Sequence, residues 1–174
     1  MSNVSQKAKA LFDQACQQMS EGELDKAIET LSTCMDIAPY EAGLYRGRAT
    51  AHFEMQNWKA AQSDFQRAMD LEPGDVENWV GLAMSLAMDK QMVAGIQVIE
   101  AYWRTYPRCV RTEMVVGLLY RRMGVSHKAK DYLLDALQRH PTPDEKTLIQ
   151  SQLADLQKPL AASDEGPEFD VPGS

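Results

Sequence analysis

The fold is decided by a stretch in the middle of the chain, NWKAAQSDFQRAMDLEP at residues 57–73, whose small residues and closing proline recur along the sequence. Its proline belongs to a series spaced by 34 residues, namely Pro39, Pro73, Pro107 and Pro141. Chance placement of 8 prolines in 174 residues would almost never give three equal intervals. The chain is therefore a tandem repeat.

Three positions in each repeat keep one kind of side chain. The first is small, at Ala15, Ala49, Ala83 and Gly117, and the second is also small, at Ala27, Ala61, Gly95 and Ala129. The third is large and apolar, at Leu31, Phe65, Ile99 and Leu133. Small residues are expected where two helices cross closely, because a larger side chain would hold them apart. These residues and the period resemble the tetratricopeptide repeat family, in which two helices and a turn form one unit.

The resemblance implies an all-α fold, a right-handed α-solenoid of four helix-turn-helix repeats with a C-terminal capping helix. The predicted repeats are 8–41, 42–75, 76–109 and 110–143, and with a capping helix at 144–157 they make up a repeat domain over residues 1–157. We expect the first helix to begin near Lys7 and Asp144 to be the N-cap of the capping helix. The acidic composition beyond Pro159 predicts a disordered tail over residues 158–174.

Two positions depart from the repeat pattern. The first bulky position reads Leu11, Tyr45 and Trp79 in three repeats, but Glu113 in the fourth. The last small position reads Cys34, Ala68 and Ala136, but Tyr102 in the third repeat. These departures leave the packing between repeats 3 and 4 open.

Charge and composition exclude several classes of function. The chain has 18 Lys and Arg against 25 Asp and Glu, a net charge of −7, which disfavours binding to nucleic acid or anionic lipid. It has no run of about 18 apolar residues, and its first ten residues carry polar Ser, Asn, Gln and Lys instead of an apolar signal core, so we expect a cytoplasmic protein without membrane contact. The stretch from Arg104 to Lys130 contains seven basic residues and one acidic residue. This excess of positive charge creates a local positive field, or it belongs to an ordinary solvated charged face.

The sequence predicts no enzyme, metal site or cofactor. The histidines His52, His127 and His140 lie in different repeats, and no nucleophile or phosphate-binding motif accompanies them. His52 is interpreted as a packed neutral side chain. The cysteines Cys16, Cys34 and Cys109 form no C-x-x-C pair and are interpreted as free thiols.

The resemblance also implies that the first helices of successive repeats line a concave groove. Carried over by position, the candidate peptide-binding residues are Phe12, Cys16, Met19, Arg46, Thr50, Phe53, Val80, Met84, Met88, Arg111, Met114, Leu118, Arg121 and Arg122. This groove would be apolar and methionine-rich in the middle, with arginines towards one end. Such a surface suits a ligand with large hydrophobic side chains, to which methionine adapts.

Similar co-chaperones grip the acidic C-terminus of heat-shock chaperones with Lys, Asn and Arg. At the positions compared, this chain has Phe12, Cys16, Gly47 and Gly81, so the carboxylate clamp is absent. We therefore expect an adaptor or chaperone-like module that binds an extended or helical apolar segment of another protein. Its size and acidity are similar to those of the small cytosolic chaperones of bacterial type III secretion.

Two further hypotheses stay open. The chain could be a self-assembling scaffold, a homo-oligomer formed through the apolar helix 79–88 and the aromatic cluster Tyr102, Trp103 and Tyr106 of repeat 3. The acidic tail could fold back as an internal ligand onto Arg111, Arg121 and Arg122, or it could stay solvated and touch nothing.

Overall fold

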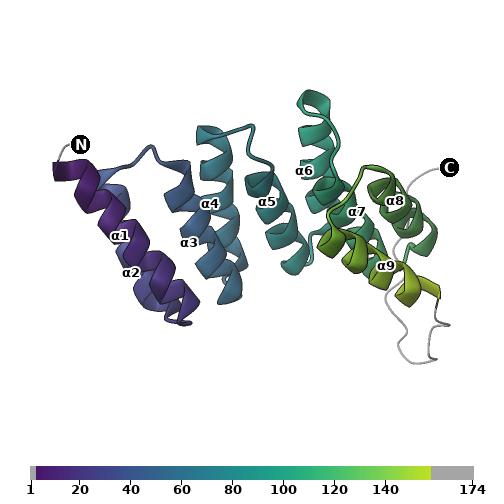
Figure 1. Cartoon of the computed structure of the whole chain (residues 1–174), viewed down its shortest axis with the longest axis horizontal. Helices are drawn as coiled ribbons and strands as arrows, with labels where there is room; N and C mark the ends of the chain where they lie inside the picture. Colours follow the sequence, from purple (N-terminus) through teal and green to yellow (C-terminus); the bar gives the residue numbers. More distant parts are fainter. Residues whose placement is uncertain (1–2, 158–174) are drawn as a thin grey trace.

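The computed structural model of the protein describes residues 3–157, and the predicted acidic tail lies outside them. In this part of the chain there are nine α-helices and no strand. The helices are α1 (Asn3–Ser20), α2 (Leu24–Ile37), α3 (Ala42–Glu54), α4 (Trp58–Leu71), α5 (Val76–Met88), α6 (Met92–Thr105), α7 (Val110–Arg122), α8 (Ser126–Gln138) and α9 (Pro143–Gln157). Figure 1 shows them side by side along the long axis, with α1 and α2 at one end and α8 and α9 at the other.

Consecutive helices pack as four hairpins, α1 with α2, α3 with α4, α5 with α6, and α7 with α8, followed by the single helix α9. This confirms the predicted all-α solenoid. The twelve residues that defined the repeat are all buried. At Gly95 a Cβ atom would come within 2.7 Å of the Ala83 carbonyl oxygen, so the close crossing of α5 and α6 requires glycine there.

Two helix starts differ from the prediction. Helix α1 begins at Asn3 instead of near Lys7. Asp144 is not the N-cap of α9, because the helix begins one residue earlier, at Pro143. Thr142 caps it instead: its Oγ1 accepts a hydrogen bond from the Glu145 N–H at 3.3 Å, and Glu145 Oε2 accepts one from the Thr142 N–H at 2.9 Å. The sequence T-P-D-E carries this capping box with proline at the first helical position, a signal that outweighs a lone Asp.

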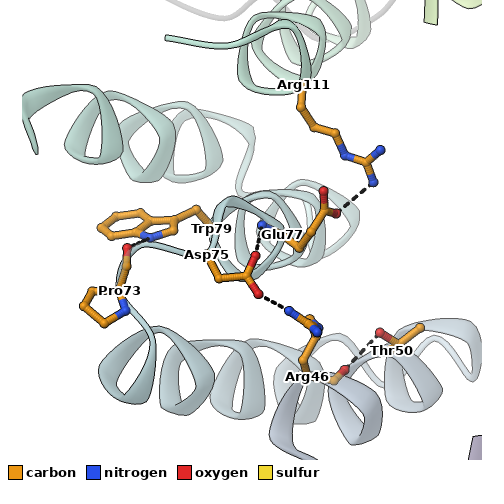
Figure 2. A network of polar contacts seen from close by, with 7 residues as sticks. All are labelled: Arg46, Thr50, Pro73, Asp75, Glu77, Trp79 and Arg111. Carbon is orange, nitrogen blue, oxygen red and sulfur yellow. Dashed lines mark hydrogen bonds and ion pairs between the residues drawn. The ribbon is translucent and has the colours of Figure 1, made fainter. Parts of the chain in front are cut away.

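The linkers between hairpins contain the periodic prolines. Two of these linkers are held by the same kind of hydrogen bond, from an aromatic side chain of the next helix to the proline carbonyl. The Tyr45 hydroxyl donates to the Pro39 carbonyl at 3.1 Å, and Trp79 Nε1 donates to the Pro73 carbonyl at 2.9 Å (Figure 2). In repeat 4 this position is Glu113, whose carboxylate cannot donate such a bond. The third linker is extended instead, with Tyr106 at φ −120° and ψ 152°.

The junction of repeats 3 and 4 accommodates both departures from the repeat pattern. Tyr102 is buried, with its ring edge-on to Trp79 at 5.6 Å between centroids and stacked on Tyr106 at 4.9 Å. Glu113 has no exposed surface, and its Oε2 accepts a hydrogen bond from Arg139 Nε at 2.7 Å. An aromatic cluster and an ion pair between the buried Glu113 and the exposed Arg139 therefore replace the small residue and the bulky apolar residue of the other repeats.

Candidate functional site

A hollow lies between α1 and α3. It consists of two adjoining pockets with volumes of about 570 and 400 Å³, and Phe12, Gly43 and Arg46 line both. The first pocket continues towards α2 and the linker that follows it, where Ile37 and Ala38 line it, and the second continues along α1 to Met19. Together they form a continuous groove on the first helices of repeats 1 and 2.

Glycines on α3 keep this groove open. A Cβ atom added at Gly43 would meet nothing within 4 Å, and one at Gly47 would come no closer than 3.5 Å to the Leu31 side chain. The corresponding glycine of α5 is different, because a Cβ atom at Gly81 would overlap the ring of Phe65. Space is therefore left beside α3 and is filled beside α5.

The walls of the groove are mainly apolar and contain two of the three cysteines. Cys16 is exposed and lines the second pocket, whereas Cys34 is buried at the back of the first. The Cys34 Sγ donates to the Ala8 carbonyl at 3.2 Å, and burial raises the pKa of its thiol. Cys34 is therefore a structural thiol that ties α2 to α1, as its place at a small position of the repeat predicts.

A polar network crosses the same face at the N-terminal end of α5. Figure 2 shows Arg46 of α3 and Arg111 of α7 both reaching towards this end, where Arg46 pairs with Asp75 and Arg111 Nη2 donates to Glu77 Oε2 at 2.8 Å. Asp75 also caps α5 by accepting a hydrogen bond from the Glu77 N–H at 3.0 Å. Arg46 and Arg111, two of the four arginines of the predicted groove, are thus already held by carboxylates of this chain.

The structure brings the candidate residues of repeats 1 and 2 together. Phe12, Cys16, Met19, Arg46 and Thr50 all line the groove between α1 and α3. Thr50 also donates its hydroxyl to the Arg46 carbonyl at 2.9 Å, which leaves its methyl group for the pocket wall.

Phe53 and the candidates of repeat 3 are half-buried. Phe53 packs edge-on against Trp58 of α4, with 5.1 Å between ring centroids. Val80 and Met84 lie against the core of repeats 3 and 4, and Met88 Sδ is 2.9 Å from Arg122 Nη1. These side chains of α5 are therefore only partly accessible to a ligand.

Helix α9 lies over part of repeat 4. Met114 is only 8% exposed and packs with Ile149 of α9. Arg121 donates to the side-chain oxygen of Gln152 and lies 3.7 Å from the Asp155 carboxylate. Leu118 stays half-buried. The basic residues of this region are therefore partly neutralised within the chain, because Arg111 and Arg121 both have carboxylate partners.

Sequence reasoning missed the other wall of the groove. Ile37, Glu41 and Glu72 come from the end of α2 and from the two proline linkers, not from the first helices. One signal was present for Glu41, because it directly precedes the first helix of repeat 2 and so lies beside a helix that was expected to line the groove.

His52 is half-buried near the end of α3. Burial lowers the pKa of His52, and its Nδ1 is buried without a hydrogen-bond partner, which agrees with a packed neutral side chain. Residues 3–157 contain no group of three His, Cys, Asp or Glu placed to hold a metal ion. In the same range, no helix is both long and apolar enough to span a bilayer.

Comparison with known sequences gives a partial match. No family model matches the chain. RNA polymerase II-associated protein 3 of Rattus norvegicus and of Mus musculus is 36% identical over 67 residues, which is 38% of this chain. The match spans only 10% of the length of those proteins.

Comparison with solved structures identifies the fold. The crystal structure of MamA superposes with a TM-score of 0.68 at 23% identity, covering 81% of this chain and 80% of MamA. The first TPR of Spaghetti (RPAP3), bound to the HSP90 peptide SRMEEVD, superposes with a TM-score of 0.62 at 21% identity, covering 69% of this chain and 95% of that domain. The chain thus has the tetratricopeptide repeat fold, as its sequence predicted.

Proposed function

We propose that this protein is an adaptor or chaperone-like interaction module that holds an apolar segment of a partner protein in the groove between α1 and α3. The observation that carries this proposal is the pair of adjoining pockets, which are mainly apolar and large enough to take side chains of a bound peptide. The Spaghetti domain, which has the same fold, is a precedent for peptide binding.

The chemistry of the groove favours an apolar ligand over the acidic peptide of that precedent. Phe12, Cys16 and Gly47 line the groove and cannot act as cationic or amide donors towards a carboxylate. Arg46 is already paired with Asp75. An acidic C-terminus would therefore find few free donors, whereas hydrophobic side chains would find matching walls.

Peptide selection followed by point substitution tests the proposal. Random linear peptides displayed on phage are selected on the full chain, and the affinities of synthetic copies are measured by fluorescence polarisation. Phe12→Glu places a charge between the two pockets and should weaken binding by about tenfold or more, since a buried anchor contact is lost. Met84→Glu combined with Met88→Glu should weaken only those ligands that extend along α5.

The matched control is Gln66→Glu on the exposed outer side of α4, which adds the same charge away from the groove. Circular dichroism checks that every variant keeps its helices. The proposal fails if no peptide binds, or if Phe12→Glu and Gln66→Glu bind the selected peptides equally well.

The alternative of a self-assembling scaffold has less support. It relied on the apolar helix 79–88 and on the aromatic cluster Tyr102, Trp103 and Tyr106 of repeat 3. The rings of that cluster stack within the chain, Tyr102 on Tyr106 and Trp103 on Tyr132. The solution mass distinguishes the two ideas, because a scaffold should form a discrete oligomer without any ligand.

A further inference from the structure

The repeat supplies an internal model for what fits into the groove. Leu31 of α2 is equivalent to Phe65 of α4, one repeat later. Gly47 of α3 is equivalent in the same way to Gly81 of α5. In the later pair, the Phe65 ring fills the space beside Gly81 so completely that a Cβ atom there would overlap it. In the earlier pair, the shorter Leu31 stays 3.5 Å or more from a Cβ atom placed at Gly47, and the second pocket of about 400 Å³ opens there.

From this difference we propose that the groove between α1 and α3 receives an aromatic side chain of the partner, in the place that the Phe65 ring fills one repeat later. The inference rests on the proposed function and specifies its ligand. Phe12 and Met19 of α1 supply an aromatic ring and a polarizable sulfur at this pocket, two groups that pack favourably against another ring.

The charged residues at the rim of the groove indicate which residues should flank the aromatic residue of the partner. Glu41 and Glu72 line the first pocket, and within residues 3–157 neither carboxylate takes part in an ion pair or a side-chain hydrogen bond. Of the two cations on this lining, Arg46 is already paired with Asp75, which leaves Lys9. The rim is therefore acidic, and it complements Lys or Arg next to the aromatic residue of the ligand.

The net charge of residues 1–75 also favours a basic ligand. Residues 1–75 contain 7 Lys and Arg against 12 Asp and Glu, so the whole N-terminal half repels an acidic ligand. The chain's own Phe169 stands between Glu168 and Asp170, which gives it the wrong charge for this rim. An aromatic residue flanked by basic residues on another protein fits both the space and the field.

The composition of the selected peptides is the first test. Peptides from the random library should be enriched in Phe, Tyr or Trp beside Lys or Arg, and replacing that aromatic by Ala should weaken binding by about tenfold or more. Glu41→Gln combined with Glu72→Gln should weaken binding at low salt and have little effect at high salt, since the rim contacts are exposed. Peptides that are acidic, or that lack an aromatic residue, would overturn the inference.

The second test fills the pocket with a larger side chain of the protein itself. Leu31→Phe should place a ring in the pocket as Phe65 does one repeat later, and should abolish most of the affinity without altering the surface charge. Leu134→Phe on the exposed side of α8 is the matched control, because it makes the same change away from the groove. Since Leu31 is buried, Gly43→Leu serves as a second blocking variant whose added side chain meets open space.

The outcomes separate this inference from the function on which it rests. If no peptide is selected by the wild-type chain, both fail. If peptides bind and are sensitive to Phe12→Glu, but bind the folded Leu31→Phe and Gly43→Leu variants as tightly as wild type, the groove stays a peptide site and the aromatic pocket is refuted. Loss of binding in both blocking variants with Leu134→Phe unaffected supports the inference.

Discussion

At the junction of repeats 1 and 2, Arg48 of α3 donates to both carboxylate oxygens of Asp64 in α4, each at 2.8 Å, and to Ser32 in α2 at 3.0 Å. At the junction of repeats 3 and 4, Tyr132 stands where Asp64 stands two repeats earlier, and its ring stacks between those of Trp103 and Tyr120. A polar bridge thus joins three helices in the first half, and stacked rings join three helices in the second. The same backbone repeat accepts either solution.

The two halves also differ on the groove side. Beside Gly47 there is room for a Cβ atom at ordinary contact distance from Leu31, whereas beside Gly81 the ring of Phe65 leaves no such room, and in repeat 4 the corresponding residue is the buried Val115. Helix α9 covers Met114 as well. The comparison teaches that side-chain size at equivalent positions, and not the helix path, decides where a solenoid leaves room for a ligand.

The largest expected effect comes from the ion pair of the second half, between the buried Glu113 and the exposed Arg139. Arg139→Ala leaves the Glu113 carboxylate buried without its partner and should lower the free energy of unfolding by about 2–3 kcal/mol. Urea denaturation measures this loss. Adding Glu113→Leu, which restores the residue type of Leu11 in repeat 1, should recover most of it, and an unchanged midpoint for Arg139→Ala alone would contradict the importance of this pair.

A glycine-to-alanine substitution at the equivalent positions Gly47 and Gly81 compares the two regions directly. Gly81→Ala should cost about 1–3 kcal/mol, because the new methyl group overlaps the Phe65 ring in a packed core. Gly47→Ala should stabilise the fold by about 0.5–1 kcal/mol, since alanine favours the helix and the methyl group has room. Thermal denaturation of both variants is the measurement. Melting-temperature shifts of the same sign in both variants would show that the space beside Gly47 and the space beside Gly81 do not differ as described.

The smallest effect is a pH dependence of the first half. Burial is the main cause that lowers the pKa of His52; the Asp64 carboxylate opposes this shift, and the Arg48 charge adds a smaller lowering. The unfolded chain therefore takes up a proton below a pKa of about 6.5 while the folded chain does not, so stability falls as the pH drops from about 7 towards 5. The slope should stay below about 1.4 kcal/mol per pH unit, the limit for one proton.

Replacing His52 by Phe should flatten this slope, and His127→Phe, which changes an exposed residue of α8, should leave it intact. Urea denaturation over the same pH range makes the comparison. Equal slopes in the wild-type chain and His52→Phe would assign the pH dependence to other groups.

Local residue types predicted most of the helix pattern but missed details that depend on competing signals. Asp144 is a good N-cap residue, yet Thr142 is used because Glu145 can return a hydrogen bond to it. Glu113 was recognised as a departure, but its partner could not be predicted, because Arg139 lies on the following helix and nothing in the spacing links the two. The same holds for Arg46 and Asp75.

By itself, the sequence determined the period, the order of helices and the buried small positions. It could do so because a close helix crossing tolerates only small side chains, which leaves a record at fixed intervals. Only the tertiary structure decided that two adjoining pockets lie between α1 and α3, and that Arg111 and Arg121 are held by carboxylates. Those features depend on how far side chains from different repeats reach into shared space, a distance that sequence spacing does not encode.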